Sequence, residues 1–180
     1  MANAVAPFGA TRRAALRRCS AVILVTVGSM MPFDRLIKSA DGWAQQHPEE
    51  NVLAQIGSGT YTPLHMRAVK MLSPEELRER LQQSRMVIGH AGMGTIIMAL
   101  ELQKPLIVLP RLQHLGEHTT DHQVATAKKF QDRAGIFVAW DEKEAVEALS
   151  GAWVPACLPD LPKQASSELL DCIRKFIDKA

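Results

Sequence analysis

Cysteine is scarce in this sequence, and long apolar runs are missing from it. The three cysteines, Cys19, Cys157 and Cys172, form no Cys-x-x-Cys pair and are odd in number. This pattern argues against a disulfide framework and predicts the reduced thiols of a cytosolic protein. No apolar run approaches the roughly 18 residues that a bilayer-spanning helix needs. We therefore expect membrane association only through a partner or through a segment that lies on the membrane surface.

The N-terminal part of the chain contains basic residues but no acidic ones. Arg12, Arg13, Arg17 and Arg18 all precede the first acid, Asp34. The whole chain has 21 basic and 19 acidic residues, so the part without these arginines has a net charge of −2. The chain outside this N-terminal segment has no excess of basic residues, which argues against nucleic-acid binding. We expect residues 1–20 to be a flexible basic extension, or alternatively an amphipathic segment that touches anionic lipid or an acidic partner.

The rest of the sequence alternates between short apolar runs and helical patterns. Buried strands are predicted at 21–27, 51–56, 85–88, 106–109 and 135–140, with a shorter one at 67–71. Helical patterns begin near Pro32, Ser73, Ile96, Asp121 and Asp141, and an amphipathic one at 166–179 closes the chain. This order predicts one α/β domain at 21–180, with a Rossmann-like, doubly wound, mainly parallel sheet of about six strands.

A glycine-rich turn between a predicted strand and a predicted helix is the clearest local signal. The stretch Gly89-His90-Ala91-Gly92-Met93-Gly94-Thr95 follows an apolar run and opens a helical pattern. The first N–H groups of such a helix are unpaired, and they favour an anion such as phosphate. The spacing is neither that of a P-loop nor that of Gly-x-Gly-x-x-Gly. A tight turn that binds nothing is the alternative.

Other small or polar segments are expected at the same edge of the sheet. In parallel α/β sheets, ligands bind at the carboxyl ends of the strands. The predicted strands end there on Gly28-Ser29, on 57–63, on Met71-Leu72, on the glycine turn and on 110–121. Their convergence predicts a ligand that contains phosphate.

Histidines gather in the segment after the strand at 106–109. His118 and His122 are four residues apart, and with Asp121 they resemble metal ligands on a helix. That spacing makes a metal-dependent hydrolase one hypothesis. A helix that starts only at Thr119 or Thr120 would leave His118 outside it, which favours a loop that contacts sugar or phosphate, or a merely solvated loop.

Two further side chains at this edge could act on a ligand. Arg111 directly follows a strand and could offer a cation to phosphate or carboxylate, or else form a surface ion pair. His90 could bind substrate or act as a base near neutral pH, or else brace the turn through its two ring nitrogens.

Taken in order, the motifs resemble the glycosyltransferase family 28 C-terminal domain, the MurG-like, donor-binding half of a GT-B enzyme. They are Val25-Thr26-Val27-Gly28-Ser29, Pro32-Phe33-Asp34-Arg35-Leu36, His90-Ala91-Gly92-Met93-Gly94-Thr95, Lys104-Pro105-Leu106-Ile107-Val108-Leu109-Pro110-Arg111, Leu115-Gly116-Glu117-His118 and Asp121-His122-Gln123. The most similar groups are PssE-type subunits of exopolysaccharide glucuronosyltransferases and the catalytic subunits of split N-acetylglucosamine transferases.

The resemblance implies a metal-independent, inverting transferase that uses a UDP-sugar and needs no cofactor. Ser29, Gly92, Gly94 and Thr95 would lie at the diphosphate, and Met71-Leu72 would face the uracil. The donor sugar would be of glucuronic acid or N-acetylglucosamine type. It would be approached by Asp121, His122 and Gln123. His90 and His118 are the candidates for the catalytic base on this chain.

One position departs from the family pattern. Relatives commonly have a ribose-binding glutamate where this chain has Met98, and Glu101 lies one turn further on the same face. Glu101 could substitute for it, and a non-catalytic partner subunit is the alternative.

A complete GT-B enzyme needs two such domains, and this chain has the length of one. We therefore expect the acceptor-binding half on a separate, membrane-anchored subunit. The chain itself would be cytoplasmic, held at the inner face of the plasma membrane by that partner, and would act on a lipid-linked acceptor in polysaccharide biosynthesis.

Overall fold

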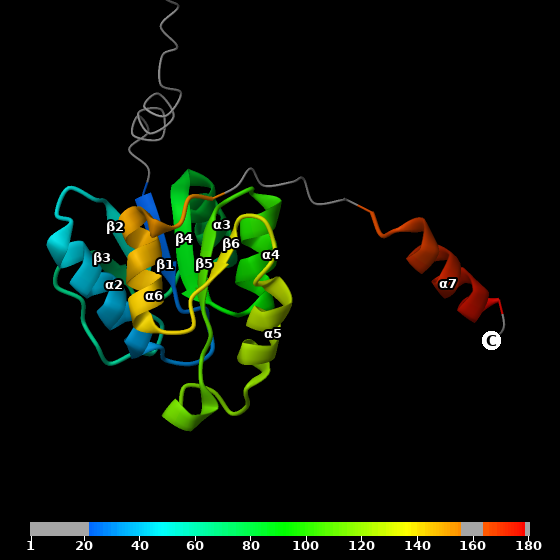
Figure 1. Ribbon diagram of the computed structural model, residues 1–180, viewed down its shortest axis with the longest axis horizontal. Helices are drawn as coiled ribbons and strands as arrows, with labels where there is room; N and C mark the ends of the chain where they lie inside the picture. The colour runs from blue at the N-terminus through cyan, green and yellow to red at the C-terminus, as the bar shows by residue number, and fades with distance from the viewer. Residues whose placement is uncertain (1–21, 156–163, 179–180) are drawn as a thin grey trace, which may run out of the picture.

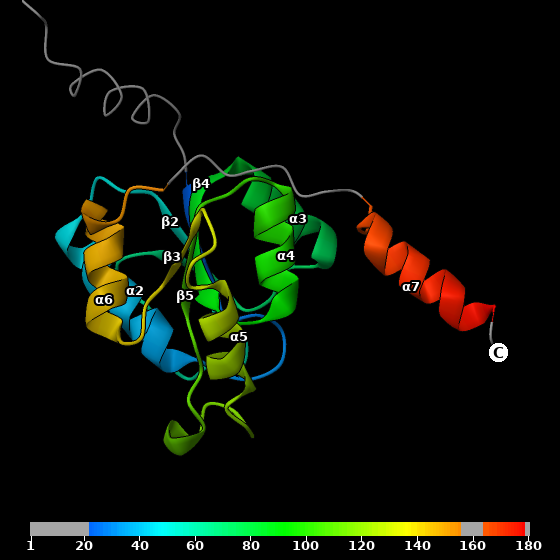
Figure 2. The same ribbon diagram turned by 45° about the vertical axis from the view of Figure 1, so that its right-hand side comes forward.

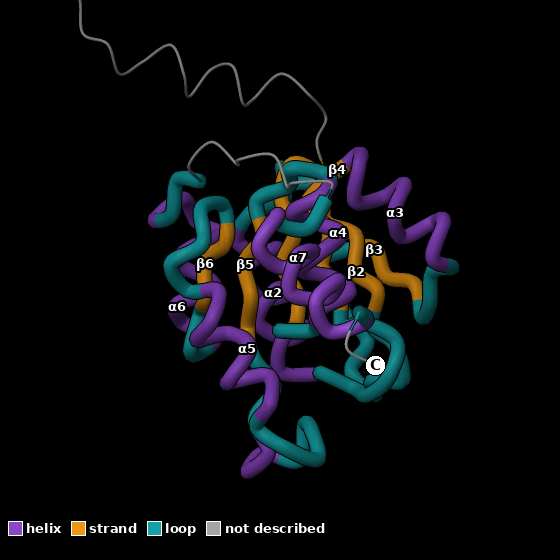
Figure 3. Tube along the Cα trace, turned by 90° about the vertical axis from the view of Figure 1, so that its right-hand side faces the viewer, coloured by secondary structure: helices purple, strands orange, loops and turns teal. Residues whose placement is uncertain are grey.

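A six-stranded parallel sheet forms the centre of the computed structural model, which describes residues 22–155 and 164–178. The strands are β1 (Val22–Thr26), β2 (Val52–Gln55), β3 (Arg67–Val69), β4 (Ser84–His90), β5 (Leu106–Leu109) and β6 (Ile136–Val138). Their order is β3-β2-β1-β4-β5-β6, and every neighbouring pair is parallel. Figure 3 shows the strands side by side in the middle of the molecule, with β6 and β3 toward opposite sides. The predicted Rossmann-like sheet is confirmed, while the expectation for residues 1–20 lies outside the described residues.

Helices cover both faces of this sheet. The helices α2 (Asp34–Gln46) and α6 (Glu142–Glu147) lie on one face, and α3 (Pro74–Gln83), α4 (Met93–Glu101) and α5 (His122–Phe130) lie on the other (Figures 1 and 2). Each face has its own buried apolar cluster, one centred on Phe33, Leu36 and Ile107 and the other on Leu24, Val87 and Ile96. The apolar runs of the strands contribute to both clusters, which is why they lack polar alternation.

Local sequence signals determine where several of these elements begin and end. Ser73 and Glu76 form the predicted capping box at the start of α3, with Glu76 N–H donating to Ser73 Oγ at 3.2 Å. Strand β4 is longer than predicted, because Gly89 pairs with Val108 and His90 with Leu109 on β5. The glycine turn therefore begins only after His90.

The C-terminal helix α7 (Ser167–Ile177) has the predicted amphipathic pattern, but none of its residues is buried. Its apolar side chains are exposed, namely Leu169, Leu170, Ile173, Phe176 and Ile177. Cys172, on the same helix, is a free thiol, whereas Cys19 and Cys157 lie outside the described residues. Within the described ranges, no helix combines the length and the apolar character that crossing a bilayer requires.

Candidate functional site

The candidate site lies at the carboxyl edge of the sheet, at the bottom of Figure 1. The strand order changes direction between β1 and β4, which is where doubly wound sheets bind ligands. Segments that follow β1, β3, β4 and β5, with the start of α5, hold most of the predicted site residues, namely Gly28, Ser29, Met71, Leu72, Ala91, Gly92, Gly94, Thr95, Arg111, Asp121, His122 and Gln123.

The N-terminus of α4 is open at this edge. Gly92 is the N-cap residue, and its carbonyl accepts the first helical bond from Ile96 N–H at 3.1 Å. Among the described residues, the N–H groups of Met93, Gly94 and Thr95 have no acceptor. These N–H groups and the positive end of the helix dipole can bind an anion. The turn therefore has the chemistry of a phosphate site.

The His90 ring separates the two glycine turns of the site. A β-carbon on Gly92 would overlap the His90 ring, and one on Gly28 would lie 2.5 Å from His90 Cε1. Gly28 also has φ +75°, a left-handed conformation that favours glycine. Both glycines therefore leave room for the His90 ring, which lies between the β1–α2 turn and the α4 N-terminus.

His90 is neutral at physiological pH. Burial, followed by the positive charge of Arg111, lowers the pKa of the His90 imidazole to about 4. A side chain with such a pKa is a weak base near neutrality. Its Nδ1 atom is buried and has no hydrogen-bond partner among the described residues. The structure therefore does not show the turn braced through both ring nitrogens, and the ring meets the turn by its close packing against Gly28 and Gly92.

Two buried glutamines tie the loops of the site together. Gln55, at the end of β2, donates to Gly28 O at 2.9 Å and accepts from Leu72 N–H at 3.3 Å. Gln123 Oε1 accepts from the N–H groups of Ala91 at 3.2 Å and Arg111 at 3.1 Å. Gln123 thus joins the ends of β4 and β5, and Gln55 joins the first turn to the segment after β3. Sequence reasoning missed Gln55, although a polar residue that ends an apolar strand at this edge was a usable signal.

Arg111 is directed beneath the site and away from solvent. It is 1% exposed, and its Nη2 atom donates to Val27 O at 2.7 Å and to Met31 O. Its guanidinium also lies over the Phe33 ring, 5.1 Å from the ring centroid. In this conformation the guanidinium holds the β1–α2 turn and presents no open surface to a ligand.

Glu117 organises the long β5–α5 loop, which contains the short 3-10 helix η1 (Gln113–Leu115). Its carboxylate forms a two-point pair with Arg35, with Nε–Oε1 at 2.7 Å and Nη2–Oε2 at 2.8 Å. It also accepts from Leu112 N–H at 2.9 Å. Arg35 reaches Pro110 O at 2.9 Å, so the start of α2 and this loop are joined directly.

The histidine cluster lacks the donor set of a metal centre. The rings of His118 and His122 are in edge contact, with centroids 4.2 Å apart. Asp121, however, accepts from Gln113 N–H at 3.0 Å. No group of three His, Cys, Asp or Glu residues in the described part of the chain could hold a metal ion. The hydrolase hypothesis built on His118, Asp121 and His122 therefore has no geometric support.

His118 is less deeply buried than His90, the other candidate base. It is half-buried, and its Nδ1 lies 3.4 Å from Thr120 N. Burial, followed by the neighbouring His122 ring, lowers the pKa of His118 below its ordinary value.

Glu101 is not brought to the site. It is the last residue of α4, at the opposite end of the helix from Gly92, and pairs with Arg78 at 3.1 Å. Because α4 starts at the carboxyl edge of the sheet, a residue one turn further along the helix, such as Glu101, lies further from that edge.

Two aspartates on α2 form hydrogen bonds with the β2–β3 loop. Sequence reasoning also missed these contacts. Asp34 accepts from the Thr60 N–H and hydroxyl, and buried Asp41 accepts from Tyr61 Oη at 2.7 Å and from the N–H groups of Leu64 and His65. Asp41 lies on the apolar, buried face of α2. An acidic residue at such a position was a signal in the sequence that could have indicated a buried hydrogen-bonding role.

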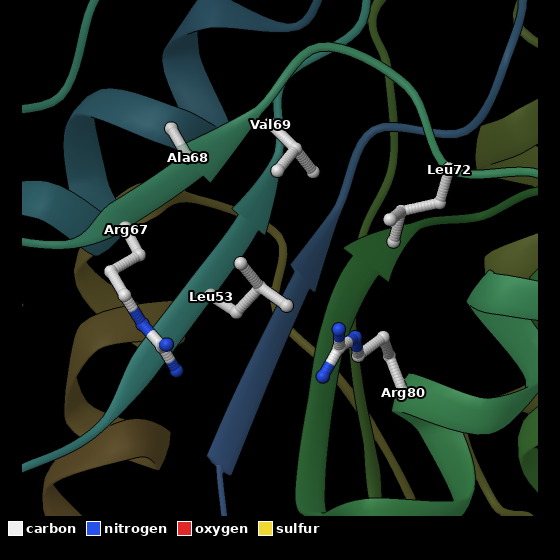
Figure 4. Close-up of a pocket in the computed structure, with 6 residues that line it drawn as sticks. All are labelled: Leu53, Arg67, Ala68, Val69, Leu72 and Arg80. Atoms are coloured by element: carbon white, nitrogen blue, oxygen red, sulfur yellow. The ribbon is translucent and has the colours of Figure 1, made fainter.

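Two hollows of the surface lie apart from the glycine turn. A groove of about 440 Å³ lies between β2, β3 and α3, lined by Leu53, Arg67, Ala68, Val69, Leu72 and Arg80 (Figure 4). A hollow of about 230 Å³ lies where the start of α2 meets the β5–α5 loop. Only Leu72 is shared between these hollows and the predicted binding residues. The open N–H groups of α4 thus lie on an exposed edge.

Comparison with known proteins gives one family. Residues 22–151 match the model of the glycosyltransferase family 28 C-terminal domain. The UDP-N-acetylglucosamine transferase subunit ALG13 of Mus musculus is 30% identical over 92 residues, which are 48% of this chain and 8% of that protein. The human subunit of the same name is 28% identical over 125 residues, 64% of this chain and 11% of that protein. The chain thus spans about a tenth of the length of these relatives.

Solved structures share the fold. An NMR structure of ALG13 superposes with a TM-score of 0.56 at 18% identity, covering 85% of this chain and 94% of that one. A crystal structure of the glycosyltransferase of kitacinnamycin has a TM-score of 0.55 at 18% identity, covering 83% of this chain and 36% of that one.

Proposed function

This chain belongs to the glycosyltransferase family 28 C-terminal domain family, and on that premise we propose that it is the donor-binding subunit of a split, inverting glycosyltransferase. The donor is a UDP-sugar, with a hexosyl unit of glucuronic acid or N-acetylglucosamine type. The observation that carries this proposal is the set of open N–H groups at the start of α4, beside the Gly28-Ser29 turn. Two glycine turns held apart by one ring suit the two phosphates of a diphosphate.

The same N–H groups supply the chemistry of transfer. An acceptor hydroxyl attacks the anomeric carbon from the face opposite UDP, the glycosidic bond to UDP breaks, and negative charge develops on the departing diphosphate. N–H groups and the α4 dipole, fixed in advance, stabilise that charge without a metal ion. The proton of the acceptor hydroxyl passes to a base, and of the two candidates on this chain His118 is favoured, because the low pKa of His90 makes that imidazole a weak base near neutral pH. The acceptor subunit could equally provide the base.

Binding of UDP by the purified chain tests the donor assignment. We expect saturable binding in calorimetry with EDTA present, and about tenfold weaker binding for Ser29→Ala, because a hydrogen bond to a charged phosphate is lost. Ser39→Ala is the matched control, since that hydroxyl bonds only within α2, to Arg35 O. No saturable binding by the wild-type chain would refute the donor assignment, and binding that needs a divalent ion would refute the metal-free site.

We also propose that the acceptor-binding half is a second, membrane-anchored subunit that covers this edge. Four exposed apolar residues follow four different strands there: Met30, Met71, Met93 and Leu115, which are 46–83% exposed. Apolar side chains gathered around an open polar site are typical of an interface. The partner would place the chain at the cytoplasmic face of the plasma membrane and supply a lipid-linked acceptor for polysaccharide synthesis.

Leu115 gives a test of this interface. With the cognate partner, Leu115→Ser is expected to weaken the complex about tenfold, because apolar area at the interface is lost. Val154→Ser is the control, since Val154 is exposed but lies away from this edge, beyond α6. Co-purification and transfer assays measure the effect. Equal affinity for both variants would place the partner elsewhere.

A further inference from the structure

Arg111 is a buried cation that forms no ion pair within 4.0 Å in the described part of the chain, and its side chain is among the largest that are fully buried. Glu117 favours its charged form from a greater distance, but the Glu117 carboxylate is already paired with Arg35. Its polar contacts are the carbonyl oxygens of Val27 and Met31, and its Nε atom has no partner. Burying a charge in this way is costly unless something compensates for it. The arrangement therefore calls for a negative charge nearby.

The two carbonyl groups that Arg111 binds flank the β1–α2 turn. Gln55 binds a third carbonyl of the same turn, that of Gly28, at 2.9 Å. Carbonyl oxygens repel anions, and these two side chains hold three of them away from the open edge. The N–H groups of Ser29 and Met30, between them, have no acceptor among the described residues. The turn is thus left with donors and without acceptors, which is the composition of an anion-binding nest.

The buried side-chain polar atoms that lack partners gather at this turn. In the described ranges there are two such side-chain atoms, Arg111 Nε and His90 Nδ1. Arg111 holds the turn from below, and His90 contacts Gly28 from the side of β4. Unsatisfied polar groups are rare in folded proteins and cluster at functional sites.

We propose that Arg111 is a positioning residue for the diphosphate of the ligand. It acts through the β1–α2 turn, by holding the carbonyls of Val27 and Met31 inward, and by placing a positive charge beneath the N–H groups that face the ligand. This inference rests on the proposed function, and it moves Arg111 from direct contact with substrate to a place below the turn. The negative charge of the bound diphosphate compensates the buried positive charge of Arg111. Arg111 therefore affects the affinity for the phosphates and not that for the nucleoside.

Three probes separate this role from a merely structural one: UDP, inorganic pyrophosphate and uridine, each titrated by NMR into the wild type and into Arg111→Met and Arg111→Lys. We expect Arg111→Met to bind UDP and pyrophosphate about tenfold more weakly or worse, while uridine affinity changes less than about twofold. Arg111→Lys should recover part of the loss, because it keeps the charge and one donor. Arg85→Met is the control, since that arginine pairs with Glu50 at the other edge of the sheet.

Each outcome decides a different point. Equal loss for uridine and for the phosphates would overturn the proposal, as would a pyrophosphate affinity that the Met variant leaves unchanged. A wild type that binds pyrophosphate but not UDP refutes the donor assignment alone, and the pyrophosphate series then still decides the role of Arg111. If Arg111→Met does not fold, the Lys variant is decisive, because a purely structural role predicts that it loses all three ligands together.

Discussion

The Gly92→Ala variant should lose at least tenfold in affinity for UDP and about 1–3 kcal/mol in the free energy of unfolding. The added methyl group would overlap the His90 ring. The ring lies close to Gly28 on its other side, which limits the room into which it can move. Overpacking therefore has to shift either the ring or the α4 N-cap, and both determine where the open N–H groups lie. Calorimetry with UDP and urea unfolding measure the two effects.

Gly42→Ala is the matched control, because a β-carbon there meets nothing within 4 Å. It lies inside α2, and alanine should stabilise it by up to about 1 kcal/mol. In the double variant His90→Ala/Gly92→Ala, the methyl group has room, so the cost of Gly92→Ala should be smaller than in the wild type. If Gly92→Ala lowers the free energy of unfolding equally with and without the His90 ring, contact with that ring is not the reason for glycine at position 92.

Asp41→Ala is expected to lower the free energy of unfolding by about 3 kcal/mol or more. Asp41 is 1% exposed, and its removal leaves the N–H groups of Leu64 and His65 and the hydroxyl of Tyr61 without their acceptor. Asp132→Ala is the control, since Asp132 is exposed and should change stability by less than about 0.5 kcal/mol. Urea unfolding at pH 7 measures both.

The pH dependence gives a second check on Asp41. Burial alone would raise the pKa of its carboxyl, but the N–H groups of Leu64 and His65 and the Tyr61 hydroxyl hold it below the ordinary value of 3.8. A carboxyl with a lowered pKa in the fold stabilises fully above its unfolded pKa and loses that effect as the pH falls through the folded value. The difference between wild type and Asp41→Ala should thus shrink as the pH falls below about 4. A difference that does not narrow in acid would contradict this account.

The elements that sequence reasoning predicted well are those determined by local signals. The capping box at Ser73 needs only residues three positions apart, and the short, β-branched apolar run at 21–27 is typical of a strand buried on both faces of a sheet. The parallel order of strands then brings the loops after β1, β4 and β5 to one edge. That placement follows from the alternation of strands and helices and needs no knowledge of side-chain contacts.

The direction of side chains within the site could not be predicted in this way. Arg111 and Gln123 are polar residues at a ligand edge, yet both use their polar atoms on backbone groups far away in the sequence. Glu101 was assigned by helical periodicity, which gives the face of a residue but not its distance from the helix start. Asp41 holds a loop more than twenty residues away, a contact that exists only once the sheet has formed.

The central position of β1 has a consequence for synthesis on the ribosome. One edge of β1 pairs with β2, but the other pairs with β4, which begins almost sixty residues after β1 ends. At about 5–20 residues per second, roughly 3–12 seconds separate the two strands. During that time the apolar strand has an open edge, which can pair with other chains. A central strand of the sheet is therefore left with an unpaired edge during synthesis, so slower translation would prolong the interval in which a nascent chain needs a chaperone.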